Sequence, residues 1–168
     1  MNLSQGNLSK GNQAGFTLVE LVMVIVLTGI LSFGASSLFS SRDAYAGFIG
    51  KDLLISNALL AQQIAMGMSA TVNPVSLKIE RNLQDTWVFT LTKVGQAARV
   101  VSQKSSGANL LIDGVSLSAG ASHVFTWDSK ANLVDGAHHE IRFVGINAFR
   151  VCLSSSGYAY ESKVVCPT

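Results

Sequence analysis

The hydrophobic and polar positions divide the chain into three stretches with different periodicities. In the first, residues 16–38, most side chains are apolar and Glu20 is the only ionisable one. A helix of these 23 residues would be roughly 34 Å long, enough to cross a hydrocarbon core of about 30 Å. We therefore expect a single membrane-spanning helix at the front of the chain.

The second stretch, residues 39–72, has the period of an amphipathic helix. We predict one continuous helix from Phe16 to about Met68, ended by Gly67 and Asn73-Pro74, whose second half covers a β-sheet with its apolar face. The expected apolar face contains Tyr45, Phe48, Ile49, Ile55, Leu59 and Met66, and the expected polar face contains Asp43, Lys51, Asn57 and Gln62.

Four glycines lie inside this predicted helix, and each weakens it by about 0.8–1 kcal/mol relative to Ala. One interpretation is close packing against neighbouring helices, because small residues let two backbones approach. The other is local melting when the protein leaves a lipid environment. Both stay open for Gly29, Gly34, Gly47 and Gly50.

In the third stretch, residues 73–168, apolar and polar residues alternate as in half-buried strands. Trp87 and Trp127 lie in such strands, which favours core packing over a ligand-stacking platform. Asp113-Gly114 and Asp135-Gly136 are turn dipeptides rather than calcium ligands. The chain is thus predicted to be α+β, with one long helix on an antiparallel sheet. Strands are expected at Val75–Glu80, Thr86–Lys93, Ala98–Gln103, Val115–Ser118, Ser122–Trp127, Glu140–Val144, Phe149–Leu153 and Tyr158–Val165.

Composition argues against a catalytic or nucleic-acid-binding protein. Only 13% of the residues are charged and the net charge is +2, whereas average soluble domains carry about 25% charged residues. No phosphate-binding loop or activated nucleophile has a recognisable spacing. We expect no enzyme activity, no cofactor and no nucleic-acid partner. A DNA-binding patch is a weak alternative that needs four scattered cations to converge: Arg99, Arg142, Arg150 and Lys163.

The tripeptide His138-His139-Glu140 invites a metal interpretation. Adjacent residues of a strand point to opposite faces, so only one of the two histidines would lie on the same side as any given partner. His123 could join them only through folding that the pattern does not reveal. We expect no metal site, and we interpret these histidines as solvated residues at a strand edge.

The position of Glu20 is the strongest functional signal. A carboxylate inside a membrane helix costs on the order of 2.5–3.5 kcal/mol, and no Lys or Arg lies between Lys10 and Arg42. Cleavage after Gly15 would supply a cation, because Phe16 would carry a free α-amino group one helical turn before Glu20. In an assembly, the amine of one subunit could instead meet Glu20 of its neighbour. Cleavage by ordinary signal peptidase near residues 35–37 is the competing interpretation.

The heptapeptide Gly15-Phe16-Thr17-Leu18-Val19-Glu20-Leu21 resembles the prepilin processing site of type IV pilins and type II secretion pseudopilins. The resemblance implies that prepilin peptidase removes residues 1–15, with Gly15 as the last leader residue, and methylates Phe16. It implies that Glu20 guides assembly with other pilin or pseudopilin subunits. Residues 16–38 would hold the protein in the inner membrane as a single-pass anchor before assembly. Residues 39–72 would complete the helix, and residues 73–168 would form a periplasmic domain that later reaches the pilus surface.

Three functions within this resemblance stay open. The first is a minor pilin that takes part in pilus biogenesis, because residues 42–63 are similar to a minor pilin of the mannose-sensitive haemagglutinin pilus. The second is a minor pseudopilin of type II secretion, and the third is a pilus-tip adhesin or DNA-binding minor pilin. Cys152 and Cys166, in a secreted context, most simply make one disulfide, and the resemblance implies the same. The closed loop would either staple the chain end or face partners.

Overall fold

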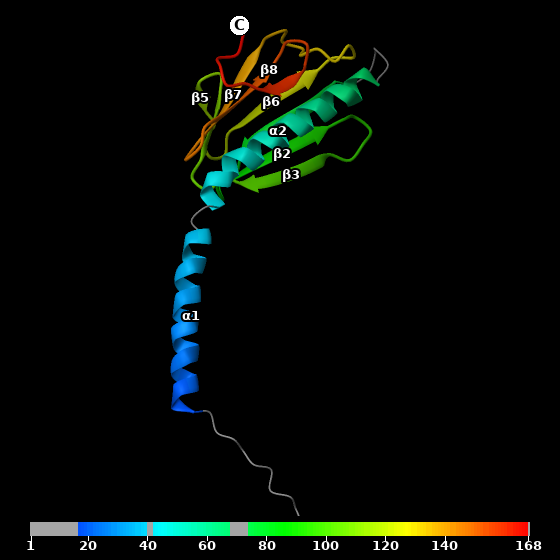
Figure 1. Ribbon diagram of the computed structural model, residues 1–168. Helices are drawn as coiled ribbons and strands as arrows, with labels where there is room; N and C mark the ends of the chain where they lie inside the picture. Colours follow the sequence, from blue (N-terminus) through cyan, green and yellow to red (C-terminus); the bar gives the residue numbers. More distant parts are fainter. Residues whose placement is uncertain (1–16, 40–41, 68–73, 168) are drawn as a thin grey trace, which may run out of the picture. The chain divides into compact units, whose positions relative to one another are not determined.

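The structure is a computed structural model that describes residues 17–39, 42–67 and 74–167. The chain forms two compact units, residues 1–39 and residues 40–168. Helix α1 (Leu18–Phe39) belongs to the first unit, and helix α2 (Arg42–Met66) belongs to the second (Figure 1). Helical structure is therefore confirmed on both sides of residues 40–41. The predicted continuity at residues 40–41 and the predicted start at Phe16 lie outside the described residues.

The first unit presents its apolar side chains outward. Every side chain of α1 from Leu18 to Ser32 is exposed. In the described part of the chain, no helix combines the length and apolarity needed to cross a membrane.

The described residues of the second unit form nine strands in two antiparallel sheets (Figure 1). The strand order is β3-β2-β1-β6 in one sheet and β5-β4-β7-β8-β9 in the other. This confirms the α+β class with a helix on antiparallel sheets. The strands are β1 (Val75–Arg81), β2 (Thr86–Thr92), β3 (Arg99–Lys104), β4 (Asn109–Ile112), β5 (Val115–Ser116), β6 (Ser122–Trp127), β7 (His139–Val144), β8 (Phe149–Leu153) and β9 (Ala159–Glu161).

The predicted strands are recovered with one strand added, two shortened and several ends shifted by one residue. One of the shortened strands is β5, which ends at Ser116 rather than at the predicted Ser118. Strand β4 was not predicted, because Leu110, Leu111 and Ile112 form an apolar run without alternation. Strand β9 is shorter than the predicted Tyr158–Val165, since it ends at Glu161. The turn between β4 and β5 is Asp113-Gly114, where both residues have positive φ (50° and 80°). This is the backbone that Asp-Gly hairpins favour, so the turn prediction is confirmed here.

Both sheets and α2 contribute to one hydrophobic core. Its largest side chains are aromatic and come from strands of both sheets, with exposed fractions of 0–1%. Trp87 and Phe143, one from each sheet, meet edge to face with ring centroids 5.1 Å apart. The core interpretation of Trp87 and Trp127 is therefore confirmed. The core aromatic residues are Trp87, Phe89, Phe125, Trp127 and Phe143.

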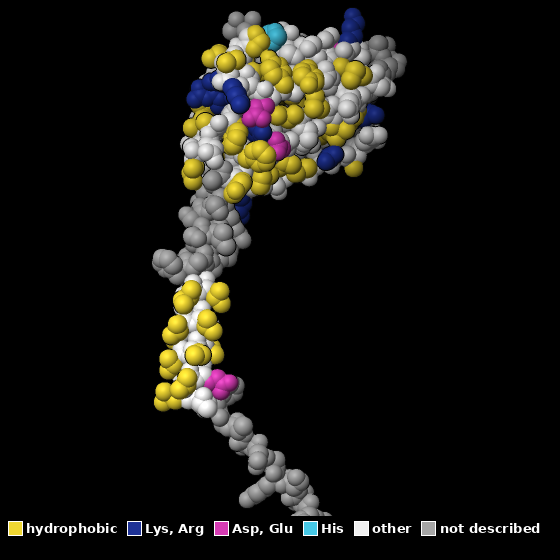
Figure 2. Space-filling view, in the orientation of Figure 1, with side chains coloured by type: hydrophobic (Ala, Val, Ile, Leu, Met, Phe, Trp, Pro, Cys, Tyr) yellow, Lys and Arg dark blue, Asp and Glu magenta, His cyan; other side chains and the backbone are white. Residues whose placement is uncertain are grey.

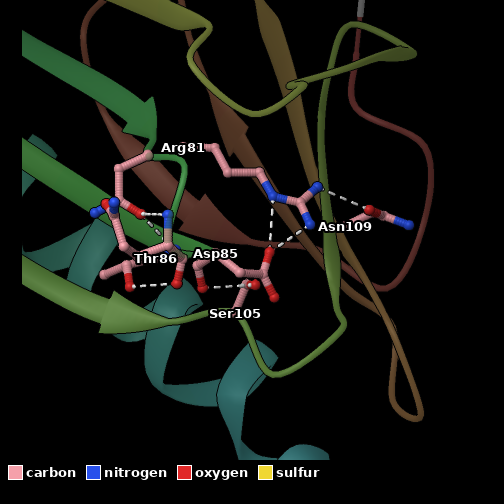
Figure 3. A network of polar contacts seen from close by, with 7 residues as sticks. Arg81, Asp85, Thr86, Ser105 and Asn109 are labelled. Atoms are coloured by element: carbon pink, nitrogen blue, oxygen red, sulfur yellow. Dashed lines mark hydrogen bonds and ion pairs between the residues drawn. The ribbon is translucent and has the colours of Figure 1, made fainter.

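A polar network ties the two sheets together at one end (Figure 3). Arg81, at the end of β1, donates from Nε to Asp85 Oδ1 at 3.0 Å and from Nη1 to Asn109 Oδ1 of β4 at 3.0 Å. Ser105 donates to the backbone oxygen of Asp85. Hydrogen bonding by Ser105 and Arg81 holds the pKa of the Asp85 carboxyl below its usual range. Arg81 thus links the first sheet to β4 of the second.

The predicted face of α2 is wrong for most of its residues, although Ile55 does pack partly buried against the core. The exposed fractions are 60% for Tyr45, 44% for Phe48 and 59% for Met66, whereas those of Lys51 and Asn57 are 5% and 2%. The side chains that α2 buries against the sheets are mostly small. They are Ala46, Leu54, Ala58, Ala61 and Ala65.

The reason for this orientation lies in the sheets. Their aromatic side chains already fill much of the core, so α2 makes its closest approach with small residues. Its larger Leu54 is buried, and Leu53, Ile55, Leu60 and Ile64 pack partly buried against the core. Gly50 is the closest point of approach, because a Cβ at this position would lie 2.7 Å from both Phe143 Cε1 and Trp87 Cζ3. Gly47 faces Phe149 in the same way, with its nearest approach at 3.3 Å. Both glycines serve packing within the second unit, which neither open interpretation anticipated. Residue Gly29, in α1, has open space around it.

Replacing Gly50 tests this close approach. Gly50→Ala should lower the free energy of unfolding of the second unit by about 1–3 kcal/mol, because the added methyl group forces Trp87 and Phe143 apart. This loss opposes the roughly 0.5–1 kcal/mol that Ala usually gains over Gly in a helix. Urea unfolding followed by tryptophan fluorescence measures the change.

The matched control is Gly67→Ala at the end of α2, where the nearest atom to an added Cβ lies 3.6 Å away. This variant should shift the unfolding free energy by less than about 0.5 kcal/mol. Equal stability of the Gly50→Ala protein and the unmodified protein would contradict the packing account.

Candidate functional site

The N-terminal candidate site is described from Thr17 onward, so Gly15 and Phe16 lie outside the described residues. The backbone N–H of Glu20 donates to Thr17 Oγ1 at 3.2 Å. Thr17 therefore caps α1, and the sequence Thr-x-x-Glu is the pattern of a capping box. Sequence reasoning missed this role, although the spacing contains the signal.

The capped start of α1 gives a second physical reason for an acidic residue at position 20. The carboxylate lies in the first turn of α1, where the positive end of the helix dipole favours an acid. It is the only ionisable side chain in α1 (Figure 2). No cation of the same helix is present to neutralise it, so the predicted requirement for a partner from elsewhere stands.

Helix α1 is not amphipathic, because apolar side chains lie on all of its sides. Large apolar side chains with exposed fractions between 49% and 77% point outward around the helix, and they surround Glu20 in sequence (Figure 2). Such a surface favours contact with lipid or with other apolar helices over contact with water. The side chains are Leu18, Val19, Leu21, Val22, Met23, Val24, Ile25, Val26, Leu27, Ile30 and Leu31.

The second predicted site, the cysteine pair, is a disulfide in the structure. Cys152 of β8 and Cys166 are joined, with their Cα atoms 5.6 Å apart, which is an ordinary separation for a disulfide. The loop that they close contains β9 and the turn through Gly157. Trp127 Nε1 donates to the backbone oxygen of Gly157 at 3.0 Å, which holds this turn against β6. The disulfide hairpin, residues 152–166, is therefore bound to the body of the domain at two points.

A buried lysine makes a third attachment. Lys51 of α2, predicted to be solvated, donates to Glu161 Oε2 of β9 at 2.7 Å and lies 3.3 Å from Asp52. Its ammonium also lies 4.5 Å from the ring centroid of Phe48. Burial alone would lower the pKa of Lys51, but the hydrogen bonds to Glu161 and Asp52 outweigh burial and raise it. The long separation in sequence between Lys51 and Glu161 explains why no local pattern revealed the pair.

The interpretation of His139 as a solvated residue is also wrong. Its exposed fraction is 9%, and its ring lies between two carboxylates. Nδ1 is 2.7 Å from Asp113 Oδ2, and Nε2 is 2.8 Å from Asp135 Oδ2. Both aspartates belong to the Asp-Gly turns, so the turns place the carboxylates that a protonated imidazole requires. His138 is exposed, as expected.

Protonation of His139 is favoured by this geometry. Burial alone would lower its pKa, but the hydrogen bonds to Asp113 and Asp135 outweigh burial and raise the pKa above 6.5. His123 of β6 lies 6.1 Å away between ring centroids. Burial and the charge of His139 lower the pKa of His123. The pKa values of these two histidines, one from each sheet, are therefore shifted in opposite directions.

The predicted basic patch forms only in part. Arg142 of β7, Arg150 of β8 and Lys163 line one pocket of about 420 Å³. Arg99 lies on β3 of the other sheet, so it does not join them. A four-cation DNA patch is therefore not built, but a smaller basic pocket lies beside the disulfide hairpin.

Comparison with known families agrees with the N-terminal site. The prokaryotic N-terminal methylation motif matches residues 10–36, a segment that includes Gly15, Phe16 and Glu20. The match confirms the prepilin-type signal and supports a type IV pilin-like protein or a pseudopilin. It implies processing by prepilin peptidase and assembly with other pilin-like subunits. No curated protein and no solved structure matches the chain.

The pH dependence of stability tests the His139 contacts. A raised pKa means that the contribution of His139 is fully present below the unfolded pKa of about 6.5 and is lost as pH rises through the folded pKa. Stability should therefore fall as pH rises above about 6.5, and His139→Gln should remove this fall. Chemical unfolding at a series of pH values measures it.

The control is His138→Gln, which should keep the pH dependence of the unmodified protein. His123 acts in the opposite sense, because its lowered pKa makes its protonation destabilising as pH falls below about 6.5. The comparison between variants isolates His139 from this effect. An identical pH profile in the His139→Gln and unmodified proteins would refute the assignment.

Proposed function

We propose that this protein is a structural subunit of a type IV pilus or of a related secretion filament, and that it has no catalytic role. Prepilin peptidase removes residues 1–15 and methylates Phe16, and the mature chain joins the filament through α1. The observation that carries this proposal is the methylation motif over residues 10–36, in register with a helix whose only ionisable side chain is Glu20.

The exposed apolar surface of α1 supplies the driving force. Burial is worth about 25 cal/mol per Å² of apolar area, so α1 is far more stable in a bilayer or among other helices than in water. Residues 16–38 hold the subunit in the inner membrane before assembly, and the second unit lies in the periplasm. In the filament, the helices of neighbouring subunits replace the lipid.

Glu20 gives this transfer a direction. An unpaired carboxylate is costly in an apolar surrounding, and the α-amino group of a methylated Phe16 on a neighbouring subunit neutralises it. A subunit added in the correct register therefore removes the cost, whereas one added out of register does not. The capping by Thr17 keeps the carboxylate at the end of the helix where that amine arrives.

The outward face of α2 supports the same role for the second unit. Tyr45, Phe48 and Ile49 are 40–60% exposed although they are large and apolar. A groove of about 580 Å³ runs from Tyr45 and Ile49 to Gln103 and Lys104 on β3. These side chains are available to neighbouring subunits because the fold of the domain buries the opposite, small-residue face of α2.

Within this class we favour a minor pilin of the mannose-sensitive haemagglutinin type, which takes part in pilus biogenesis. The likeness of residues 42–63 to such a subunit supports this choice. The alternative is a minor pseudopilin of type II secretion. Deleting the gene and scoring surface pili and protein secretion separately distinguishes the two roles.

The processing step is tested first. When the full chain is expressed with an active prepilin peptidase, intact mass and N-terminal sequencing should show a chain that begins at N-methyl-Phe16. Without the peptidase, or with Gly15→Glu, the chain should keep its leader. A start near Ser36, or an unprocessed chain in both strains, would overturn the proposal.

Assembly is tested separately with Glu20→Gln. This variant should be processed normally but should enter filaments at least about tenfold less often, because the neutral amide no longer pairs with the neighbouring amine. Immunoblotting of sheared filaments against total membrane protein measures the ratio. Glu20→Asp, which keeps the charge, is the matched control and should recover part of the loss. Normal incorporation of Glu20→Gln would contradict the assembly role.

A further inference from the structure

The basic pocket beside the disulfide hairpin contains an unusual arrangement of charge. Arg142 of β7 and Arg150 of β8 are directly opposite one another in the antiparallel pair. Like charges at such positions repel and destabilise the sheet. Neighbours Ile141, Phe143 and Val151 are buried, so by strand alternation both arginines lie on the outward face. The fold therefore holds two guanidinium groups side by side where water can reach them.

One carboxylate is shared between these two arginines. Glu140 lies two residues before Arg142, with Oε1 3.9 Å from Arg142 Nη1 and Oε2 2.9 Å from Arg150 Nε. The backbone N–H of Cys166 also approaches Oε2, at 3.4 Å. Glu140 thus orients Arg150 and anchors the chain end, but its single charge cannot balance two cations.

Lys163 adds a third cation to the pocket. Its place is set by the chain on both sides of it, because Ser162 N–H donates to the backbone oxygen of Arg150 at 3.0 Å and Cys166 is held by the disulfide. Among the described residues, no carboxylate lies within ion-pair distance of the Lys163 ammonium. The other acid that lines the pocket, Glu161, is bound to Lys51. The free charge in the pocket is therefore positive.

The geometry points to a phosphate monoester as the ligand of this pocket, a function beyond filament assembly. Two guanidinium groups and an ammonium suit a dianion better than a single carboxylate, and paired arginines offer the forked donors that phosphate oxygens accept. The volume of about 420 Å³ exceeds that of a phosphate group, and Phe149 forms part of its wall. The Phe149 ring itself packs against Phe48 of α2, with ring centroids 5.9 Å apart, so the pocket offers a small organic body such as a sugar room beside the phosphate rather than an aromatic face.

The test uses the full chain in a neutral maltoside detergent, with glucose 6-phosphate and inorganic phosphate as separate probes in isothermal titration. Glucose 6-phosphate should bind saturably with one site per chain, and more tightly than inorganic phosphate because its sugar fills pocket volume that a phosphate alone leaves empty. Arg142→Gln and Lys163→Gln should each weaken binding by about tenfold or more. Both variants should fold normally, because Arg142 has only the 3.9 Å contact with Glu140.

The matched control is Arg99→Gln, which removes the same charge from an exposed position on the other sheet. Binding in this variant should stay within about twofold of the unmodified protein. Absence of saturable binding would overturn the proposal, and so would equal loss in the Arg99→Gln variant, which would show a general charge effect. Binding confined to single-stranded DNA, without binding of either small phosphate, would replace this pocket with a distributed nucleic-acid surface. Far-ultraviolet circular dichroism of each variant verifies that the compared proteins are folded.

Discussion

The second unit depends on the close approach of α2 to two sheets at once. At Gly50 the helix backbone comes so near to Trp87 and Phe143 that no side chain fits between them. Since Trp87 and Phe143 belong to different sheets, the backbone of α2 at Gly50 contacts both sheets at once. The alanines that follow at intervals of three or four residues, Ala58, Ala61 and Ala65, continue the approach along the helix. Tyr45 and Phe48 remain 60% and 44% exposed, because the side of α2 that makes this approach carries Gly50 and the alanines.

The hairpin at the end of the chain is held by interactions of three different kinds. The disulfide limits the freedom of the unfolded chain, and for a loop of about 15 residues this effect is worth about 3 kcal/mol. The hydrogen bond from Trp127 fixes the turn at Gly157, and the ion pair from Lys51 joins β9 to α2. A short strand with few ladder bonds of its own is thereby kept in place. The basic pocket formed with Lys163 depends on this restraint.

Sequence patterns were sufficient wherever the physical cause is local. Alternation located most of the strands, the Asp113-Gly114 turn followed from its residue types, and the methylation motif followed from seven consecutive residues. The patterns failed where the cause is tertiary. The face of α2 was misjudged because the prediction placed the most hydrophobic side chains toward the sheet. The aromatic side chains of the sheets leave room mainly for small residues at the closest approach. His139 was misjudged because its two carboxylates come from turns 26 and 4 residues away in the chain, and Lys51 because Glu161 lies 110 residues away.

One side of α2 approaches the sheets closely and the other is exposed, so substitutions on the two sides have different consequences. Changes at Gly50 or Ala58 affect the folding of the subunit itself, so their consequences arise in every copy regardless of its neighbours. A change at Tyr45, which is 60% exposed, leaves that packing intact and alters the outer surface of the domain. The outer residues are thus freer to change, while the inner ones are tied to the sheets beneath them. In such a helix, substitutions on the exposed side can change the outer surface without changing the packing that stabilises the fold.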